Sequence, residues 1–389
     1  MRILDRQRFW AFFKAYCTCY VSLVGLFIVI DAFSNMDEFQ KRADGVAEIM
    51  KVMGRYYLSH QAAYFDLLGS VIGMMAAIFT VTWMQRNNEH LAMLAAGIST
   101  HRAIRPVLFS SVIVSALSVV NQEVIIPRYA EEIQKTHDDD GVRKVQVTSR
   151  YDSRGVMIDG SEADRTSRTI VTRFNATILP EVFGVIHKIE AKQATYIPPD
   201  ASRAPIRGGW LIRGAALSPT VDPELLELGA SILTKVHDAA GFPPALGDPA
   251  ALKGETYFLK TTLSFKSMTR KPNWYKYASM GEAVDGLVDP ATDITERGDI
   301  TMNIHFRLLR PILSLTLLFM TLPLVLGGYG RNMFINLGFA LGNSAMFYGM
   351  LLLCEYLGSS AMLIPSLAAW VPLFLFSLVA TWRWDRIKT

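Results

Sequence analysis

The chain has 389 residues, of which 51% are hydrophobic and 19% are charged. Its net charge of +4 is too small to indicate a nucleic-acid partner. Because the apolar residues are gathered in long runs near the two ends, the sequence predicts a membrane protein with a polar middle.

The first third of the chain, residues 1–126, is predicted to contain three membrane spans. Apolar runs at about 9–30, 62–84 and 103–126 are each close to the ~20 residues that a bilayer core requires. The first run is too long for a cleavable signal peptide and lacks a small-residue cleavage site. Residues 32–60 are amphipathic, which predicts a helix lying on the membrane surface between the first two spans.

The polar connection between the second and third spans predicts a short helix at 86–98. Asn87 or Asn88 can cap its N-terminus, and Glu89 falls in the first turn, where a carboxylate favours the helix dipole. Gly97 is the expected C-terminal stop. Residues at helical spacing predict one apolar face, made of Leu91, Leu94, Ala95 and Ile98. Such a helix serves either as a turn shielded in the lipid interface or as a docking element for a cytosolic partner.

The polar middle, residues 127–304, is predicted to form an all-β domain of the jelly-roll or sandwich type. Short runs rich in β-branched and aromatic residues alternate with Gly, Pro and Asp. The expected strands are Val145–Thr148, Thr169–Phe174, Val185–Ile189, Trp210–Ile212, Tyr257–Leu259 and Thr261–Phe265. The segment 218–254 is rich in proline and glycine and predicts a long insertion, with a short helix at 224–237.

The last part, residues 305–389, is predicted to hold three more spans, at about 306–326, 334–357 and 362–382. Six spans place both termini on one side, and arginine and lysine residues gather there, which predicts that this side is cytosolic. They are Arg2, Arg6, Arg8, Arg86, Arg102, Arg105, Arg331, Arg383, Arg386 and Lys388. The predicted fold is therefore a multi-pass α-helical membrane protein with three plus three transmembrane helices and an inserted extracytoplasmic jelly-roll domain.

The sequence contains no motif of catalytic or nucleotide-binding chemistry. It has no GxxxxGK[ST] phosphate loop, no HExxH or paired CxxC metal motif, and no GxSxG elbow. Its three cysteines lie in apolar runs, so no disulfide framework is expected in the polar middle. We expect neither an enzyme nor a cofactor or metal.

Four carboxylates lie inside or at the ends of the predicted spans: Asp31, Asp66, Glu123 and Glu355. Intramembrane acids are costly, which makes each a candidate for carrying protons or binding ions. All four are near the predicted outer ends, however, where the cost of a charge is lower. The alternative interpretation is that they are hydrated interface residues or pair with Arg307 or Arg310.

Several short motifs resemble those of the LptF/LptG family, the permease subunits that extract lipopolysaccharide from the bacterial inner membrane. Asn88-Glu89 followed by Leu94–Ser99 resembles the cytosolic coupling helix of the family. His305–Leu308 with Arg310-Pro311 is similar to its entry to the fourth span, and Ala368–Pro372 to its last-span motif. The resemblance covers nearly the whole chain, as three spans, a jelly roll and three spans.

The resemblance implies a transport subunit of the inner membrane without a nucleotide site of its own. A cytosolic ATPase dimer would dock on the coupling helix, and a paralogous permease would form the heterodimer. A periplasmic jelly-roll bridge protein would receive the lipopolysaccharide. The residues expected to couple to the ATPase are Glu89, Leu91, Leu94 and Gly97. Those expected to contact lipid phosphates are Lys41, Arg42, Arg307 and Arg310.

The sequence departs from the family pattern in three places. Asp31 stands near the level where some members carry a basic residue that contacts lipid. Ser59-His60-Gln61 replaces prolines that often precede the second span, and the 218–254 insertion is longer than the family leads us to expect.

Two other functions fit the same residues. A secondary, ion-coupled transporter would use Asp66, Glu123 or Glu355 as proton carriers and would work without an ATPase. A membrane-anchored scaffold would use the β domain only to bind partners. Loss of function on charge reversal at Glu89 is expected of the exporter alone.

Overall fold

The computed structural model describes residues 3–41, 45–134, 144–152, 154–180, 184–201, 206–219, 232–236, 242–243, 254–289, 291–327 and 333–385. The chain divides into two compact units. The first, the helical unit, comprises Met1–Asp138, Tyr275–Leu287 and Ile294–Thr389. The second, the β domain, comprises Asp139–Trp274 and Val288–Asp293.

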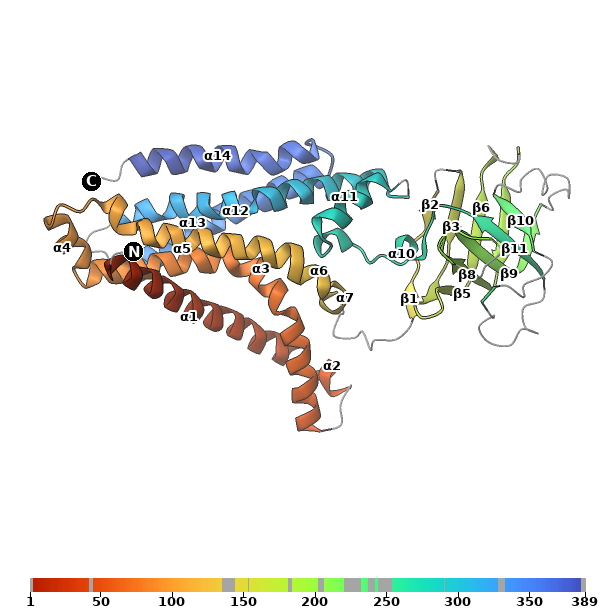
Figure 1. Cartoon of the computed structure of the whole chain (residues 1–389), viewed down its shortest axis with the longest axis horizontal. Helices are drawn as coiled ribbons and strands as arrows, with labels where there is room; N and C mark the ends of the chain where they lie inside the picture. Colours follow the sequence, from red (N-terminus) through yellow and green to blue (C-terminus); the bar gives the residue numbers. More distant parts are fainter. Residues whose placement is uncertain are drawn as a thin grey trace. The chain divides into compact units, whose positions relative to one another are not determined.

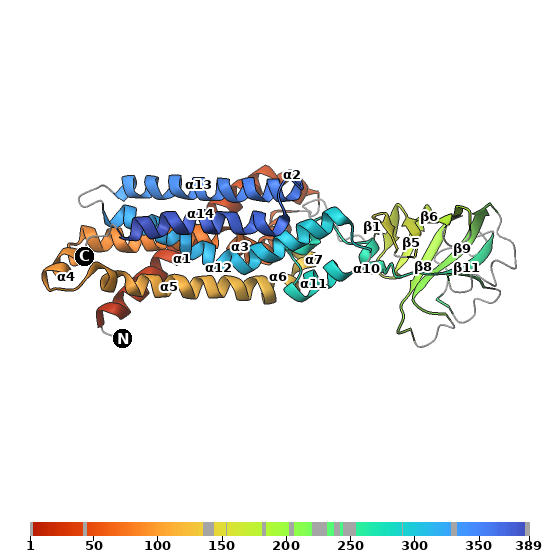
Figure 2. The same ribbon diagram turned by 90° about the horizontal axis from the view of Figure 1, so that it is seen from above.

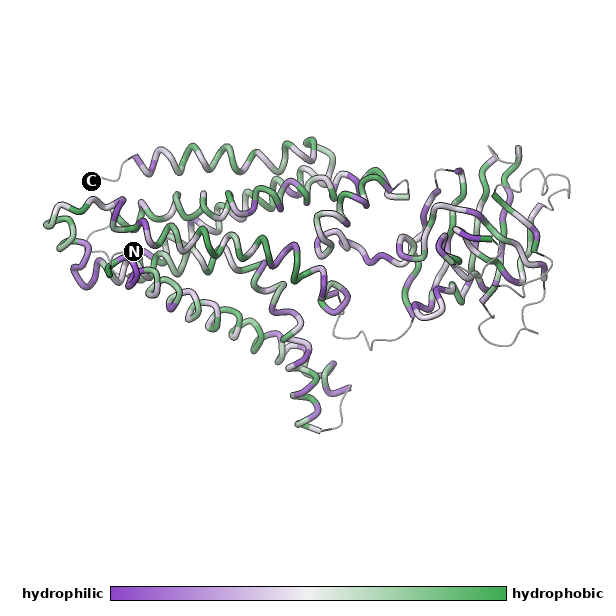
Figure 3. Tube along the Cα trace, in the orientation of Figure 1, coloured by the Kyte–Doolittle hydropathy of each residue, from purple (hydrophilic) through white to green (hydrophobic). Residues whose placement is uncertain are grey.

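Six helical segments of the helical unit are long and apolar enough to cross a membrane, as predicted, among the residues described. They are α1 (Ile3–Ser34), α3 (Val46–Arg86), α5 (Thr100–Val120) with its extension to Arg128, α12 (Ile294–Leu326), α13 (Met333–Ser359) and α14 (Pro365–Asp385). Hydrophobic residues dominate these helices along most of their length (Figure 3).

The chain between the first two spans does not form a separate surface helix, in contrast to the prediction for 32–60. A short helix, α2 (Met36–Gln40), follows α1, and α3 then runs as one continuous helix. Polar side chains near the middle of α3 are satisfied within the helix, since His60 and Ser59 both bond to the carbonyl of Tyr56. The first part of α3 lies beside α2 and bends away from the remainder (Figure 1).

The third span contains a short π-helix, η1 (Asn121–Ile125), between α5 and α6 (Ile126–Arg128). A further turn, α7 (Ala130–Ile133), follows it. The chain returns from the β domain through η3 (Trp274–Lys276) and α11 (Met280–Val288). Helix α12 begins at Ile294, twelve residues before the predicted start of the fourth span.

One hydrophobic core holds the helical unit together. Helices α12, α13 and α14 pack against one another, and α3 contacts α1, α5 and α12 (Figures 1 and 2). The buried side chains at these contacts are mainly branched aliphatic residues, with alanines among them, and they include Ile72, Met74, Ala76, Ala77, Leu317, Met320 and Leu322. Small residues let membrane helices approach closely, which is where their packing energy comes from.

The β domain is an antiparallel arrangement of eleven strands among the described residues. They are β1 (Lys144–Gln146), β2 (Arg150–Tyr151), β3 (Val156–Asp159), β4 (Glu162–Asp164), β5 (Thr169–Thr172), β6 (Phe174–Ile178), β7 (His187–Ala191), β8 (Gln193–Ile197), β9 (Gly209–Ser218), β10 (Leu233–Lys235) and β11 (Glu255–Lys260). The strand order is β1-β4-β5-β8-β9-β7-β6-β3-β2, with β11 also on β9 and β10 on β11.

The longest strand, β9, belongs to two sheets. Its first half pairs with β8 and β11, and its second half pairs with β7. The change occurs around Gly214, whose positive φ of 65° suits a residue without a Cβ. Trp210 lies at the centre of the core, packed near Phe174, Tyr196 and Phe265. This is the folded-over antiparallel arrangement expected of a jelly-roll domain.

Two local predictions for the β domain are wrong. Thr261–Phe265 is not a strand, because the hydroxyls of Thr261 and Thr262 donate to Asp152 and Ser264 caps α10 (Phe265–Met268). Residues 233–235 of the predicted 224–237 helix form strand β10, and most of the rest of that prediction lies outside the described residues.

The described part of the insertion packs on the face of β8, β9 and β11 that carries Ile197, Leu211 and Phe258. Phe242 stacks near Phe258, with ring centroids 6.4 Å apart, and the carbonyl of Pro243 accepts a hydrogen bond from Arg213. The insertion therefore adds a small second hydrophobic cluster to this sheet.

Gly209 is predicted to be intolerant of any side chain. A Cβ at this position would lie 2.2 Å from the carbonyl oxygen of Leu259 on the paired strand. We expect Gly209→Ala to lower the free energy of unfolding of the β domain by about 1–3 kcal/mol. Gly281→Ala is the control, because no atom lies within 4 Å of its added Cβ. Thermal unfolding of the full chain in detergent checks this, and identical midpoints for both variants would contradict it.

Candidate functional site

The connection between the second and third spans forms the short helix α4 (Glu89–Ala95), which ends at Gly97 as predicted, whereas the Asn88 side chain makes no capping hydrogen bond to it. Asn88 is the N-cap residue and adopts a left-handed conformation, with φ 56°. At the other end Gly97 has φ +77°, and the N–H groups of Gly97 and Ile98 donate to the carbonyls of Leu94 and Met93. This is the Schellman motif that glycine favours at a helix C-terminus.

Helix α4 packs on the rest of the chain through residues that do not belong to the predicted apolar face. His90 and Met93 are buried, and Met93 packs with Met84 and Ala103. Leu91 is 58% exposed. Of the predicted apolar face, Leu91 and Ala95 are exposed, Leu94 is half-buried, and Ile98 packs against the cluster that Met93 forms.

All four residues predicted to couple to an ATPase are at least partly accessible. Glu89 is half-buried in the first turn, Leu94 is half-buried, and Leu91 and Gly97 are exposed. They combine an apolar patch with a carboxylate at the positive end of a helix. Such a surface suits an apolar groove with a basic rim.

Arg8 ties α4 to the first and third spans. It lies on α1, is buried, and donates from Nη1 to the carbonyl of Ala103 at 3.1 Å. Its Nη2 contacts the sulfur of Met93 on the inner face of α4. A displacement of α4 is therefore resisted by contacts to both α1 and α5. From the sequence, Arg8 was counted only as a positive charge at one side of the membrane. These contacts were not predicted, because the partners of Arg8 are 85 and 95 residues away.

His90 makes the attachment of α4 sensitive to pH. Burial, with a further contribution from Arg8, lowers the pKa of His90 below its usual 6.5. The detached state takes up a proton near pH 6.5 whereas the attached state resists it. We therefore expect the attachment to weaken as the pH falls below about 6.5. Hydrogen exchange of the α4 amides, corrected for the intrinsic pH dependence of exchange, should show protection falling in that window.

The matched variant for this measurement is His90→Gln, which is neutral at every pH. Its α4 protection should not change between neutral and mildly acidic pH. The same acid-induced loss in wild type and variant would show that His90 is not the titrating group.

A second group of charged residues joins the second, third and fourth spans away from α4. Arg310 on α12 forms an ion pair with Asp66 on α3 and donates to the side-chain oxygen of Gln122 at 3.0 Å. The interpretation that intramembrane acids pair with Arg307 or Arg310 is confirmed for Asp66. The side chain of Arg310 is 39% exposed, so it remains reachable.

The π-helix η1 presents three consecutive polar side chains to three different partners. Asn121 donates to the carbonyl of Ala62 at 2.8 Å, and Gln122 meets Arg310. Glu123 accepts from the N–H of Met280 at 2.8 Å. Sequence periodicity did not predict this feature, although π-helices recur at functional sites.

Arg307 is an internal tie and not an exposed cation. Its side chain is 3% exposed, and it donates to the carbonyls of Ala278 and Tyr275. Its Nη1 also lies 3.8 Å from Glu123, which confirms the pairing interpretation for that acid. These contacts leave Arg307 without an accessible group for a lipid phosphate.

The remaining predicted site residues do not join this group. Asp31 accepts hydrogen bonds from Tyr57 at 2.8 Å and from Asn35. Glu355 pairs with Lys276 at 3.4 Å. Lys41 is exposed just after α2, and Arg42 lies outside the described residues.

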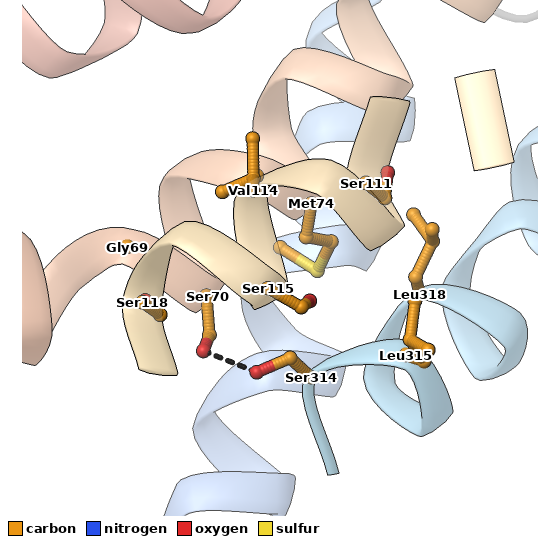
Figure 4. Close-up of a pocket in the computed structure, with 11 residues that line it drawn as sticks. Gly69, Ser70, Met74, Ser111, Val114, Ser115, Ser118, Ser314, Leu315 and Leu318 are labelled. Atoms are coloured by element: carbon orange, nitrogen blue, oxygen red, sulfur yellow. Dashed lines mark hydrogen bonds between the residues drawn. The ribbon is translucent and has the colours of Figure 1, made fainter. Parts of the chain in front are cut away.

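One turn further into the membrane, a small hydroxyl-lined cavity separates α3, α5 and α12. Ser70 and Ser314 approach each other at 2.6 Å, with the Ser115 and Ser118 side chains beside them (Figure 4). The cavity holds about 20 Å³, which is room for one water molecule. These helices therefore meet along a polar seam and not through a fully packed apolar contact.

The comparisons with known proteins agree with this architecture. The family model described as lipopolysaccharide export system permease LptF/LptG matches residues 6–145 and 252–386. The matched segments hold all six spans and α4, whereas most of the β domain and the insertion lie between them. No curated protein matches the chain. Because the match covers well over half of its length, the chain belongs to the LptF/LptG family of lipopolysaccharide export permeases and is a multi-pass inner-membrane protein.

Proposed function

We propose that the chain is a transmembrane subunit of an ATP-driven exporter that extracts lipopolysaccharide from the inner membrane. The observation that carries the proposal is α4 itself: Leu91 is exposed, Glu89 is partly accessible in the first turn, and Arg8 anchors the helix. In this proposal α4 and both termini are cytosolic, and the β domain is periplasmic.

The ATPase is a separate polypeptide in this scheme. The sequence has no phosphate-binding loop, so in this scheme ATP is hydrolysed by the ATPase, and the resulting motion reaches the chain through the contact with α4. An ATPase dimer would hold Leu91 in an apolar groove and meet Glu89 with a basic residue. Arg8 would then pass the displacement of α4 to α1 and α5.

The other partners of the proposed complex follow from surfaces that the fold leaves uncovered. Only 17% of the apolar window of α1 is buried, which leaves most of this span for lipid or for a paralogous permease. Among the described residues, the strands β1 and β2 each pair on one side only, which leaves the other side for the jelly roll of a bridge protein. Arg310 and Lys41 are the accessible cations among the predicted phosphate contacts.

The ion-coupled transporter is the weaker alternative. Asp66, Glu123 and Glu355 each accept from a defined donor: Arg310, the Met280 N–H and Lys276. Each of these carboxylates is thus engaged in a defined polar contact within the chain, which gives it a structural role that needs no transported ion.

The test is ATP-dependent extraction. The chain is purified with the ATPase and the second permease of its host and reconstituted into liposomes containing lipopolysaccharide. A soluble bridge domain carrying a photo-crosslinker should capture lipopolysaccharide only when ATP is added. Capture without an ATPase subunit would instead support the ion-coupled alternative.

A further inference from the structure

A groove runs between α12, α13 and α14 at the end of the helical unit that carries α4. Its volume is about 580 Å³, within the range of small-molecule and lipid pockets. Its lining includes Ile335, Gly338, Phe339, Gly342 and Met346 on α13 and Arg383 on α14.

Arg383 supplies a cation to this groove and has only neutral partners among the described residues. Its Nη1 donates to the side-chain oxygen of Asn343 at 3.0 Å and to the carbonyl of Met320 at 3.2 Å. Asn343 is held in turn by donating to Thr321 at 2.8 Å. These bonds orient the guanidinium, yet they supply no negative charge. Arg310, by contrast, has Asp66.

The rest of the groove is apolar and open. Ile335, Phe339 and Met346 are about half exposed, and no atom lies within 4 Å of a Cβ added at Gly338 or Gly342. From Ile335 to Met346 a helix rises about 16 Å, which is half of the ~30 Å hydrocarbon core. The groove is therefore about as long as one leaflet is deep.

We propose that this groove binds an anionic phospholipid of the leaflet on the α4 side. Its phosphate pairs with the guanidinium of Arg383, and one acyl chain lies over Gly338 and Gly342 against Phe339. Basic pockets between helices at this side of a membrane recognise anionic head groups. The guanidinium of Arg383, which has only neutral partners among the described residues, favours an anionic head group over an apolar helix of another protein.

The site differs from the lipopolysaccharide pathway proposed above in place and in ligand. It faces the leaflet next to α4, and it would hold a resident lipid and not a transported one. The inference requires only that α12, α13 and α14 cross the membrane.

Lipid mass spectrometry on the purified full chain tests the proposal. The chain is isolated with its bound subunits in nanodiscs of phosphatidylcholine doped with phosphatidylglycerol, and the retained lipids are quantified after transfer to detergent. Wild type should retain phosphatidylglycerol preferentially, and Arg383→Gln should weaken retention roughly tenfold or more, the usual effect of removing a charge-assisted hydrogen bond. Arg105→Gln is the matched control, because Arg105 is an exposed arginine near the start of α5.

A second variant keeps the cation and fills the groove. Gly342→Leu places a side chain in open space, so it should fold and yet displace the acyl chain. Loss of phosphatidylglycerol from both Arg383→Gln and Gly342→Leu, with retention in Arg105→Gln, supports the site. Equal retention of both lipids by wild type, undiminished retention by Arg383→Gln, or a photo-crosslinker at Phe339 reacting with another protein in place of lipid would overturn it.

Discussion

Glu89→Lys is expected to abolish export without unfolding the chain. The substitution reverses the charge in the first turn of α4, and like charges meeting across an interface cost several kcal/mol. That corresponds to a loss of affinity for the ATPase of roughly a hundredfold or more. The helix itself should persist, because a first-turn charge contributes only about 0.3–1 kcal/mol to helix stability. Co-purification of the ATPase with the two forms of the chain measures the effect.

Glu48→Lys is the matched control for this experiment. Glu48 is also an exposed carboxylate in the first turn of a helix, but it lies on α3 at the opposite end of the helical unit. The Glu48→Lys chain should co-purify with the ATPase as the wild-type chain does. Normal ATPase binding and export by Glu89→Lys would show that α4 does not couple to an ATPase and would support its interpretation as a turn shielded in the lipid interface.

The second large effect is expected at the ion pair between Asp66 and Arg310. Asp66→Asn leaves a cation inside the membrane with only Gln122 as a described side-chain partner. Removing one partner of a buried pair costs roughly 3–5 kcal/mol. We expect the lower end, because the Arg310 side chain is 39% exposed. Thermal unfolding in detergent should show a clearly lowered midpoint, with reduced export as a consequence.

Two further variants separate this interpretation from ion transport. Asp66→Asn combined with Arg310→Gln removes both charges and should recover part of the stability that the single variant loses. Glu355→Gln should change little, because its pair with Lys276 is exposed on both sides and such pairs contribute about 0–1 kcal/mol. An Asp66→Asn chain of wild-type stability that no longer transports would instead identify Asp66 as an ion carrier.

Local signals explain why α4 was predictable. Gly97 is needed where the chain turns through a positive φ, and Asn88 is a residue type that tolerates the left-handed region. Both act within one helical turn of the helix that they bound. The face that α4 turns inward was not predictable, because it depends on the contact of Met93 with Arg8, which is 85 residues away in the sequence. Helical periodicity reveals that a helix is two-sided, but it does not reveal which neighbour each side meets.

Long-range polar contacts account for the other errors. Thr261 and Thr262 have β-branched side chains, which favour a strand. Their hydroxyls instead donate hydrogen bonds to Asp152, more than a hundred residues away, and the segment is not a strand. The pairing with arginine was correctly predicted for Asp66 and Glu123, but Arg307 could not be recognised as buried. Its acceptors are main-chain carbonyls, which carry no signal in the sequence.

The π-helix has a consequence for how the third span accommodates changes of length. A π-turn holds one residue more than an α-turn. Deleting a single residue within Asn121–Ile125 would therefore let the segment close into regular α-helix, and α5 and α6 would keep their directions. The same deletion in the middle of α5 would rotate every later side chain of the span by about 100° relative to its neighbours. Natural variation in the length of this span should thus be confined to the five residues of η1.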